Sequence, residues 1–183
     1  GYLDKNIIEK ILEYAIFLYS PKQEVMFLPH EPYQDKVAPS TIEQCLKPSS
    51  ISYRRRKTVH RVPFEIYEIK NRIIKEFNLH EVEYTVDIFF NHLKKGQKVA
   101  IHSHAKHRLG TDLRFNIMIK NSTTGGNPFV KTNELKEIEV DDGDLWIFDG
   151  CKDHGTKQVS DDRYILSYGF IVEDHIANEI IKY

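Results

Sequence analysis

Three histidines, His102, His104 and His154, have the side chains of this sequence that are best suited to hold one metal ion together. His102 and His104 are two positions apart in Lys98–His104, whose pattern predicts a strand. Alternate side chains of a strand point to the same face, so both imidazoles are expected on one side. His154 follows the predicted strand Leu145–Phe148 and its turn, where it offers a third ligand. Histidines are also common on polar strand faces without a metal, so the prediction depends on the residues around them.

Two glycines and an arginine frame these histidines at regular spacing. Gly96 precedes His102 by six residues, and Gly143 precedes His154 by eleven. Each glycine opens a strand through a tight turn, where the absence of a Cβ permits the backbone geometry. Arg163 follows His154 by nine residues and begins the next predicted strand. This spacing favours one functional site over histidines that are unrelated to each other.

Arg163 and Ser167 predict an anion-binding site beside the histidines. They share one face of the predicted strand, together with Ile165. A guanidinium binds a carboxylate through two parallel hydrogen bonds, and a serine hydroxyl adds a third. The alternative is an edge arginine that pairs with its neighbour Asp161 or Asp162.

Arg114 and Asn116 form a second polar face, on the predicted strand Leu113–Lys120. If this face turns inward, the cation of Arg114 is costly to bury unless it has an anionic partner. Arg114 is therefore a candidate second clamp on an acid, and Asn116 is a candidate contact to a substrate. A solvent-facing Arg114 is an equally open alternative.

Helices precede and follow a region of closely spaced strands. The apolar periodicity predicts helices over Asp4–Tyr19, Pro63–Phe77 and Asp174–Lys182, and a short one over Thr41–Leu46. Strands are expected over Glu81–Leu93, Lys98–His104, Leu113–Lys120, Pro128–Lys131, Glu137–Val140, Leu145–Phe148 and Arg163–Val172. Helices followed by about seven strands predict an α+β chain that is mainly β, with an antiparallel barrel or sandwich and helices packed outside.

The composition indicates an ordinary folded chain of 183 residues, 40% of them hydrophobic and 29% charged. We expect a single domain over 1–183, with helices and a long loop in 1–80, the strand core in 81–173 and a last helix in 174–183. A net charge of −1 argues against coating nucleic acid. Two cysteines and the lack of a long apolar run predict a cytoplasmic protein without a membrane span. The first helix either covers the barrel or forms a homodimer contact.

A proline-rich segment, residues 21–62, is expected to be a largely irregular loop and a candidate lid. It contains the basic run of residues 54–57. This run is either a solvated turn or a contact to an acidic partner. Tyr53 and Arg54 are candidate substrate contacts.

The region from Tyr84 to Val172 resembles the double-stranded β-helix, a jelly-roll or cupin-like barrel, of the iron(II)- and 2-oxoglutarate-dependent oxygenases. That family carries a strand-borne His-x-Asp/Glu, a distal histidine and an arginine on the next strand. The matching residues here are His102-Ser103-His104, His154 and Arg163. Leu113-Arg114 and the run from Phe148-Asp149 to His154 resemble the aspartyl/asparaginyl β-hydroxylase branch, and the prolyl hydroxylase branch is similar as well. The resemblance covers about half the chain.

The sequence departs from the family where a carboxylate is usual, because His104 stands there. Three neutral imidazoles fit iron(II) but remove one negative charge next to the metal. His104 is thus a ligand, a bystander, or the first ligand with His102 supporting it. Asp112 and Asp87 are candidate replacements for the missing carboxylate, although their spacing is poor.

The resemblance implies an iron(II) enzyme that uses 2-oxoglutarate and O₂ to hydroxylate an unactivated C–H bond, in an amino-acid side chain that is free or part of a peptide or protein. It implies His102, His104 and His154 as metal ligands, and Arg163, Ser167 and Arg114 as binders of 2-oxoglutarate. Two alternatives stay open. One is a three-histidine cupin dioxygenase or isomerase that does not use 2-oxoglutarate, since Gly96 to His104 also resembles a cupin motif. The other is a non-catalytic binding module.

Overall fold

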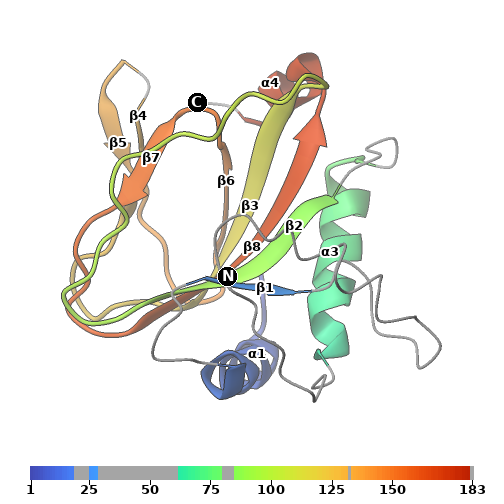
Figure 1. Cartoon of the computed structure of the whole chain (residues 1–183). Coiled ribbons are helices and arrows are strands. Elements are labelled where there is room, and N and C mark those ends of the chain that lie inside the picture. Colours follow the sequence, from blue (N-terminus) through green and yellow to red (C-terminus); the bar gives the residue numbers. More distant parts are fainter. Residues whose placement is uncertain (19–24, 29–61, 80–84, 132, 182–183) are drawn as a thin grey trace.

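The computed structural model describes residues 1–18, 25–28, 62–79, 85–131 and 133–181 (Figure 1). The predictions for Tyr53, Arg54, the basic run of residues 54–57 and the helix Thr41–Leu46 lie outside the described residues. One part of the segment expected to be irregular is a strand, β1 (Val25–Leu28), which pairs with the next strand along the chain.

The described strands form two antiparallel sheets. The larger sheet has the order β1-β2-β8-β3-β6 and contains β2 (Thr85–Leu93), β3 (Thr111–Lys120), β6 (Leu145–Asp149) and β8 (Arg163–Val172). The smaller sheet has the order β5-β4-β7 and contains β4 (Pro128–Lys131), β5 (Leu135–Glu137) and β7 (Asp153–Thr156). A mainly β fold with flanking helices is therefore confirmed.

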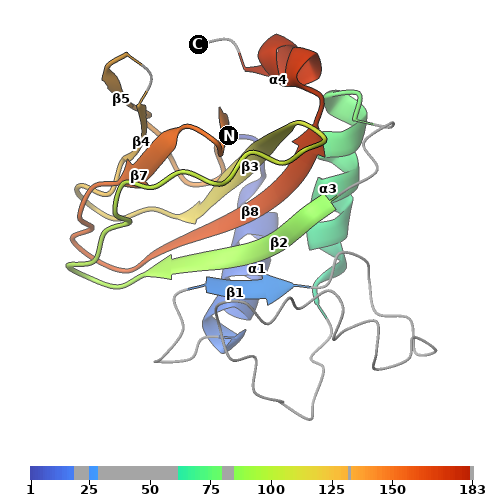
Figure 2. The ribbon, with the colours of Figure 1, turned by 45° about the horizontal axis from the view of Figure 1, so that its top comes forward.

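Helices cover one face of the larger sheet. Figure 2 shows α1 (Lys5–Leu18) and α3 (Phe64–Glu76) behind it, and α4 (Asp174–Ile180) follows β8. The backbone N–H of Ile7 donates to Asp4 Oδ1 over 3.0 Å, so Asp4 caps α1 as its residue type favours. These bounds agree with the predicted helices to within two residues. None of the described helices is long and apolar enough to cross a bilayer.

Alternation along β3 separates a helix-facing core from a second face. Leu113, Phe115 and Ile117 are fully buried in the cluster that packs against the helices. Arg114 and Asn116 point the other way, into a pocket between the two sheets. The same alternation on β8 sends Ser167 into this pocket. A sheet with both faces covered explains why β3 and β8 are buried along almost their whole length.

The strand predictions were wrong in three places. The segment Lys98–His104 is not a regular strand: it forms an isolated bridge between His102 and His154, and the carbonyl of Val99 accepts a hydrogen bond from the N–H of Thr156. The strand expected over Glu137–Val140 is found earlier, at β5. β7 was not predicted, because Asp153-His154-Gly155-Thr156 has neither the alternation nor the β-branched residues of a typical strand.

Gly155 shows why β7 forms from so unfavourable a sequence. A Cβ at this position would lie 2.7 Å from the carbonyl oxygen of Val99 and 2.8 Å from Phe129 Cζ. Only glycine lets β7 lie this close to the segment that carries His102. Tertiary contact therefore outweighs local propensity here.

Candidate metal centre

The structure brings His102, His104 and His154 together. One ligand nitrogen of each lies within 4.8 Å of the others. The ring centroids are 4.2 Å apart for His102 and His154, 5.0 Å for His104 and His154, and 5.5 Å for His102 and His104. His154 comes from β7, and the other two come from the extended segment after β2.

Backbone hydrogen bonds fix these segments against each other. The N–H of His102 donates to the carbonyl of His154 over 3.0 Å, and the reverse bond measures 2.8 Å. The N–H of His104 donates to the carbonyl of Gly150 over 2.8 Å. These bonds place the three imidazoles independently of any ligand.

All three imidazoles have the same tautomer. Each Nδ1 faces an oxygen that can only accept: the carbonyl of Ala100 for His102, at 2.9 Å, and the carbonyl of Lys152 for His154, at 2.8 Å. For His104 the acceptor is Asp112 Oδ2, at 2.6 Å. Nδ1 therefore carries the hydrogen, and the lone pair is on each Nε2. Three nitrogen lone pairs held by outer partners are a donor set that fits a divalent transition metal.

Burial keeps His154 neutral. The pKa of His154 is lowered from 6.5 to about 4, mainly by desolvation and also by the neighbouring His102, His104 and Arg114, while the bond to the Lys152 carbonyl acts in the opposite direction. A neutral imidazole is the form that binds a metal. His154 therefore needs no deprotonation to act as a ligand at neutral pH.

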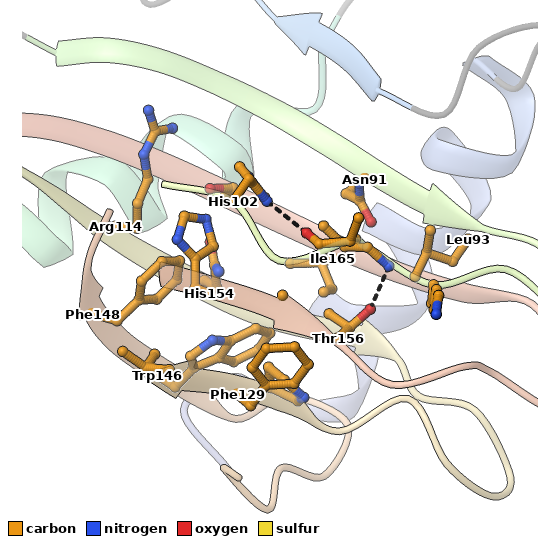
Figure 3. Close-up of a pocket in the computed structure, with 18 of the residues that line it drawn as sticks. Asn91, Leu93, His102, Arg114, Phe129, Trp146, Phe148, His154, Thr156 and Ile165 are labelled. Atoms are coloured by element: carbon orange, nitrogen blue, oxygen red, sulfur yellow. Dashed lines mark hydrogen bonds between the residues drawn. The ribbon is translucent and has the colours of Figure 1, made fainter. Parts of the chain in front are cut away.

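A cavity of about 470 Å³ opens between the two sheets beside the histidines. Figure 3 shows the aromatic side chains of Phe129, Trp146 and Phe148 along one wall, near His154. The Phe148 and His154 rings are 4.7 Å apart. Sequence analysis did not single out these aromatic residues, although the alternation of Leu145–Phe148 places Trp146 and Phe148 on one face.

Arg163 lies on the cavity wall and is fully buried. Its Nη1 donates to the carbonyl of Gly126, while Nε and Nη2 have no hydrogen-bond partner among the described residues. The alternative pairing with its acidic neighbours is not seen: Asp161 accepts hydrogen bonds from Ser122 and Thr123 instead. Asp162 bonds His92.

This guanidinium needs an anion. Burial lowers the pKa of Arg163 to about 10, so it remains charged at neutral pH. A buried cation with unmade hydrogen bonds is costly unless an anion completes it. Ser167 Oγ and Asn116 Oδ1 line the same cavity and likewise lack partners among the described residues. The cavity can therefore bind a carboxylate through the guanidinium of Arg163 and the hydroxyl of Ser167.

Arg114 differs from Arg163 because its anionic partners are protein side chains. It is buried, and it bonds Asp112 over 2.8 Å and Asp87 on its other side. Burial lowers the pKa of Arg114, but these two carboxylates outweigh it and leave the pKa above its usual value. Arg114 faces inward, and its anionic partners are two carboxylates of the protein itself. Its role in binding an external acid stays a prediction.

No protein-family model matches the sequence, and no curated protein is similar to it in sequence. Solved structures with the same fold do exist. A Trichoplax adhaerens prolyl hydroxylase in complex with a hypoxia-inducible-factor peptide is 11% identical over 100% of this chain and 84% of its own, with a TM-score of 0.62. A viral collagen prolyl hydroxylase from Paramecium Bursaria Chlorella virus-1, in complex with 2-oxoglutarate, is 13% identical over 94% of this chain and 93% of its own, with a TM-score of 0.59.

A third structure is an oxidoreductase of the 2OG-Fe(II) oxygenase family from Burkholderia pseudomallei. It is 13% identical with a TM-score of 0.50, and the match covers 62% of this chain and 59% of that one, so here the chain spans less than two thirds of its neighbour. The chain therefore has the double-stranded β-helix fold of the 2-oxoglutarate- and iron(II)-dependent oxygenases, as its resemblance in sequence implied.

Proposed function

We propose that this protein is an iron(II)- and 2-oxoglutarate-dependent dioxygenase that hydroxylates an unactivated C–H bond. The observation that carries the proposal is the presence, in one cavity, of three converging histidine nitrogens and a buried arginine without an anionic partner among the described residues. A metal site and a separate carboxylate site in one cavity suit a 2-oxo acid that carries a second carboxylate, as 2-oxoglutarate does.

In this proposal the Nε2 atoms of His102, His104 and His154 would hold iron(II). When bound, the iron supplies the oxidative chemistry: substrate, O₂ and 2-oxoglutarate give hydroxylated substrate, succinate and CO₂. One oxygen atom enters the C–H bond, and the other enters succinate. The three histidines contribute fixed geometry, because their Nδ1 atoms are already bonded to oxygen acceptors.

The distal carboxylate of 2-oxoglutarate would be held by Arg163 and Ser167. Nε and Nη2 of Arg163 and Oγ of Ser167 are buried donors without a hydrogen-bond partner among the described residues. The aromatic and aliphatic residues around them exclude water and so strengthen these charged hydrogen bonds. Arg114 is already paired with two carboxylates, so we do not assign it to the cosubstrate.

We propose an amino-acid side chain, free or in a peptide, as the substrate. Two neighbours in fold are prolyl hydroxylases, one of them bound to a peptide. Asn116 lies on the cavity wall between the two sheets and is a candidate contact.

The ligand set itself supports a second candidate, the three-histidine dioxygenase without 2-oxoglutarate. The His-x-His pair lacks the carboxylate that the oxygenase family usually carries there. In that case Arg163 would hold a carboxylate of the substrate itself. The two candidates differ in one requirement, the consumption of 2-oxoglutarate.

Turnover of 2-oxoglutarate tests the proposal. Purified protein is given iron(II), ascorbate, O₂ and 2-oxoglutarate, and succinate is measured with and without a library of amino acids and peptides. We expect iron-dependent succinate formation that the Arg163→Ala variant loses and the Arg72→Ala variant keeps. Arg72 is a matched control because it lies exposed on α3, where it contacts Tyr2 and Glu76. Succinate formation that is the same in both variants would refute the assignment of Arg163.

A further inference from the structure

Asp112 connects the histidine cluster to a buried ion-pair network. Its Oδ2 accepts the hydrogen of His104 Nδ1 at 2.6 Å and a hydrogen from Arg114 Nη2 at 2.8 Å. Asp112 and Arg114 are each only 5% exposed, so little water screens these charges. Asp112 is not among the converging ligand atoms. Of the three histidines, it contacts His104.

The network continues across three neighbouring strands. Asp87 on β2, Gly169 on β8 and Arg114 on β3 are paired in one row of the sheet. Arg114 reaches across the middle strand to bond Asp87. Asp112 lies two residues before Arg114 on the same face of β3, so Arg114 binds both carboxylates at once. Two carboxylates and one guanidinium carry one net negative charge beside His104.

Two glycines leave the space that this network needs. A Cβ on Gly169 would lie 2.8 Å from both Arg114 Nη1 and Asp87 Oδ1, in the path of their bond. A Cβ on Gly150 would lie 2.9 Å from His104 Nδ1 and 3.3 Å from Asp112 Oδ2, against the other end of the network. The backbone of Gly150 also bonds both segments: it donates to the carbonyl of Asp112 and accepts from the N–H of His104.

We propose that Asp112 is the positioning residue of the metal site: it holds His104 with Nε2 toward the other two histidines and supplies, through that imidazole, the negative charge that three neutral ligands lack. This inference rests on the proposed binding of iron(II). Arg114 and Asp87 anchor Asp112 in turn. The carboxylate that the sequence lacks at position 104 is thus provided by Asp112 on β3, which is hydrogen-bonded to the ligand His104. Asp112 replaces it as an outer partner and not as a ligand.

A negative charge next to a ligating imidazole strengthens the binding of the metal. A carboxylate that accepts the hydrogen of a ligating imidazole makes that imidazole a stronger donor, and loss of such a partner typically weakens metal binding by about 10–100-fold. An Asp112 that served only to pair Arg114 would affect folding and leave the metal affinity of the folded protein unchanged. The two roles therefore separate in one measurement.

The test compares anaerobic iron(II) affinity, by competition with a chelator, in the wild type and in Asp112→Asn. Asparagine keeps the shape and one acceptor but removes the charge. We expect an affinity about 10–100-fold weaker. Glu65→Gln is the control, since it removes one carboxylate of an exposed ion pair with Lys10 on the helical side of the sheet. Its affinity should equal that of the wild type.

Gly150→Ala is a second variant in case Asp112→Asn does not fold. It keeps every charge and crowds His104 and Asp112 where they meet, and it should also weaken iron binding. A ¹⁵N NMR spectrum of the metal-free protein reads the tautomer of His104 directly, and a shift from the Nδ1–H form in either variant supports the inference. Wild-type affinity in a folded variant would overturn the role of Asp112 alone. Failure of the wild type to bind iron(II) would overturn the proposed function with it.

Discussion

His102 and His154 are joined by a reciprocal pair of backbone hydrogen bonds, of 3.0 and 2.8 Å, although 52 positions separate them in the sequence. Their imidazole rings consequently lie 4.2 Å apart. The bridge is made by main-chain atoms, so the backbone sets the positions of the two rings. A site formed in this way is preorganised, so metal binding does not have to order the two segments that carry His102 and His154.

Single substitutions of the histidines should reveal this arrangement. We expect His154→Ala and His102→Ala to weaken iron(II) binding by more than about 100-fold, beyond the loss typical of an outer partner, because each removes a ligand atom. The backbone bridge remains, so the variants should fold. Calorimetric titration under anaerobic conditions measures the loss, with His107→Ala as the control, because His107 is exposed and outside the cluster. Equal affinity in all variants would contradict the ligand assignment.

Arg163 should show opposite effects on stability and on binding. Arg163→Met removes a buried guanidinium whose Nε and Nη2 lack partners among the described residues, and replacement of such a charge by an apolar side chain is often neutral or stabilising. We expect a thermal unfolding temperature no lower than that of the wild type, while binding of 2-oxoglutarate falls by about 10–100-fold through loss of charged hydrogen bonds. Calorimetry measures both quantities. A strongly destabilised variant would indicate a purely structural arginine.

The metal-free protein should lose stability in mild acid. Burial holds the pKa of His154 at about 4, below its ordinary 6.5. Above pH 6.5 the imidazole is neutral in both states, so the stability is fully present. Between pH 6.5 and 4 only the unfolded state binds the proton, and the loss reaches on the order of 3 kcal/mol. His92 adds a loss of the same sign, because burial lowers its pKa too.

Urea unfolding in the presence of a chelator, from pH 7.5 to 4.5, measures this loss. His154→Asn cannot take up the proton, so its stability should fall less steeply over the same range. If the wild type and His154→Asn lose stability in parallel, His154 is not the residue responsible.

A side chain at Gly169 should lower the free energy of unfolding. In Gly169→Ala the new Cβ would press on the pair between Arg114 and Asp87, and overpacking of this kind costs about 1–3 kcal/mol. Gly96→Ala is the matched control, since its Cβ would come no closer than 3.7 Å to Gln158 and only its φ of +84° is unfavourable. Denaturant unfolding compares the two. A milder effect at Gly169 than at Gly96 would argue against a tightly packed network.

Local pattern was enough to place much of the fold and the site. The bounds of β4 and β8 are those expected, and the alternation of Leu113–Lys120 correctly placed Arg114 and Asn116 opposite an apolar face. The histidine pair could be seen because its two members are close in sequence. His154 was found through its spacing from Gly143 and Arg163.

What the sequence could not show depends on contacts between distant strands. β7 forms because Gly155 packs against Val99, a contact that no local propensity encodes. Asp112 was considered only as a metal ligand, and its real partners, His104 and Arg114, appear only once β3 lies beside Gly150. The row that joins Asp87 to Arg114 depends on strand register, which short-range patterns leave open.

Anaerobic titration of the protein with iron(II) and then 2-oxoglutarate, followed by visible absorption, tests the central claim most directly. We predict a metal-to-ligand charge-transfer band that appears only when both are present, at one iron and one 2-oxoglutarate per chain, and that is weakened in Arg163→Ala. If iron(II) binds and 2-oxoglutarate produces no band, the cavity serves another acid. If iron(II) does not bind at all, the three histidines are not a metal centre.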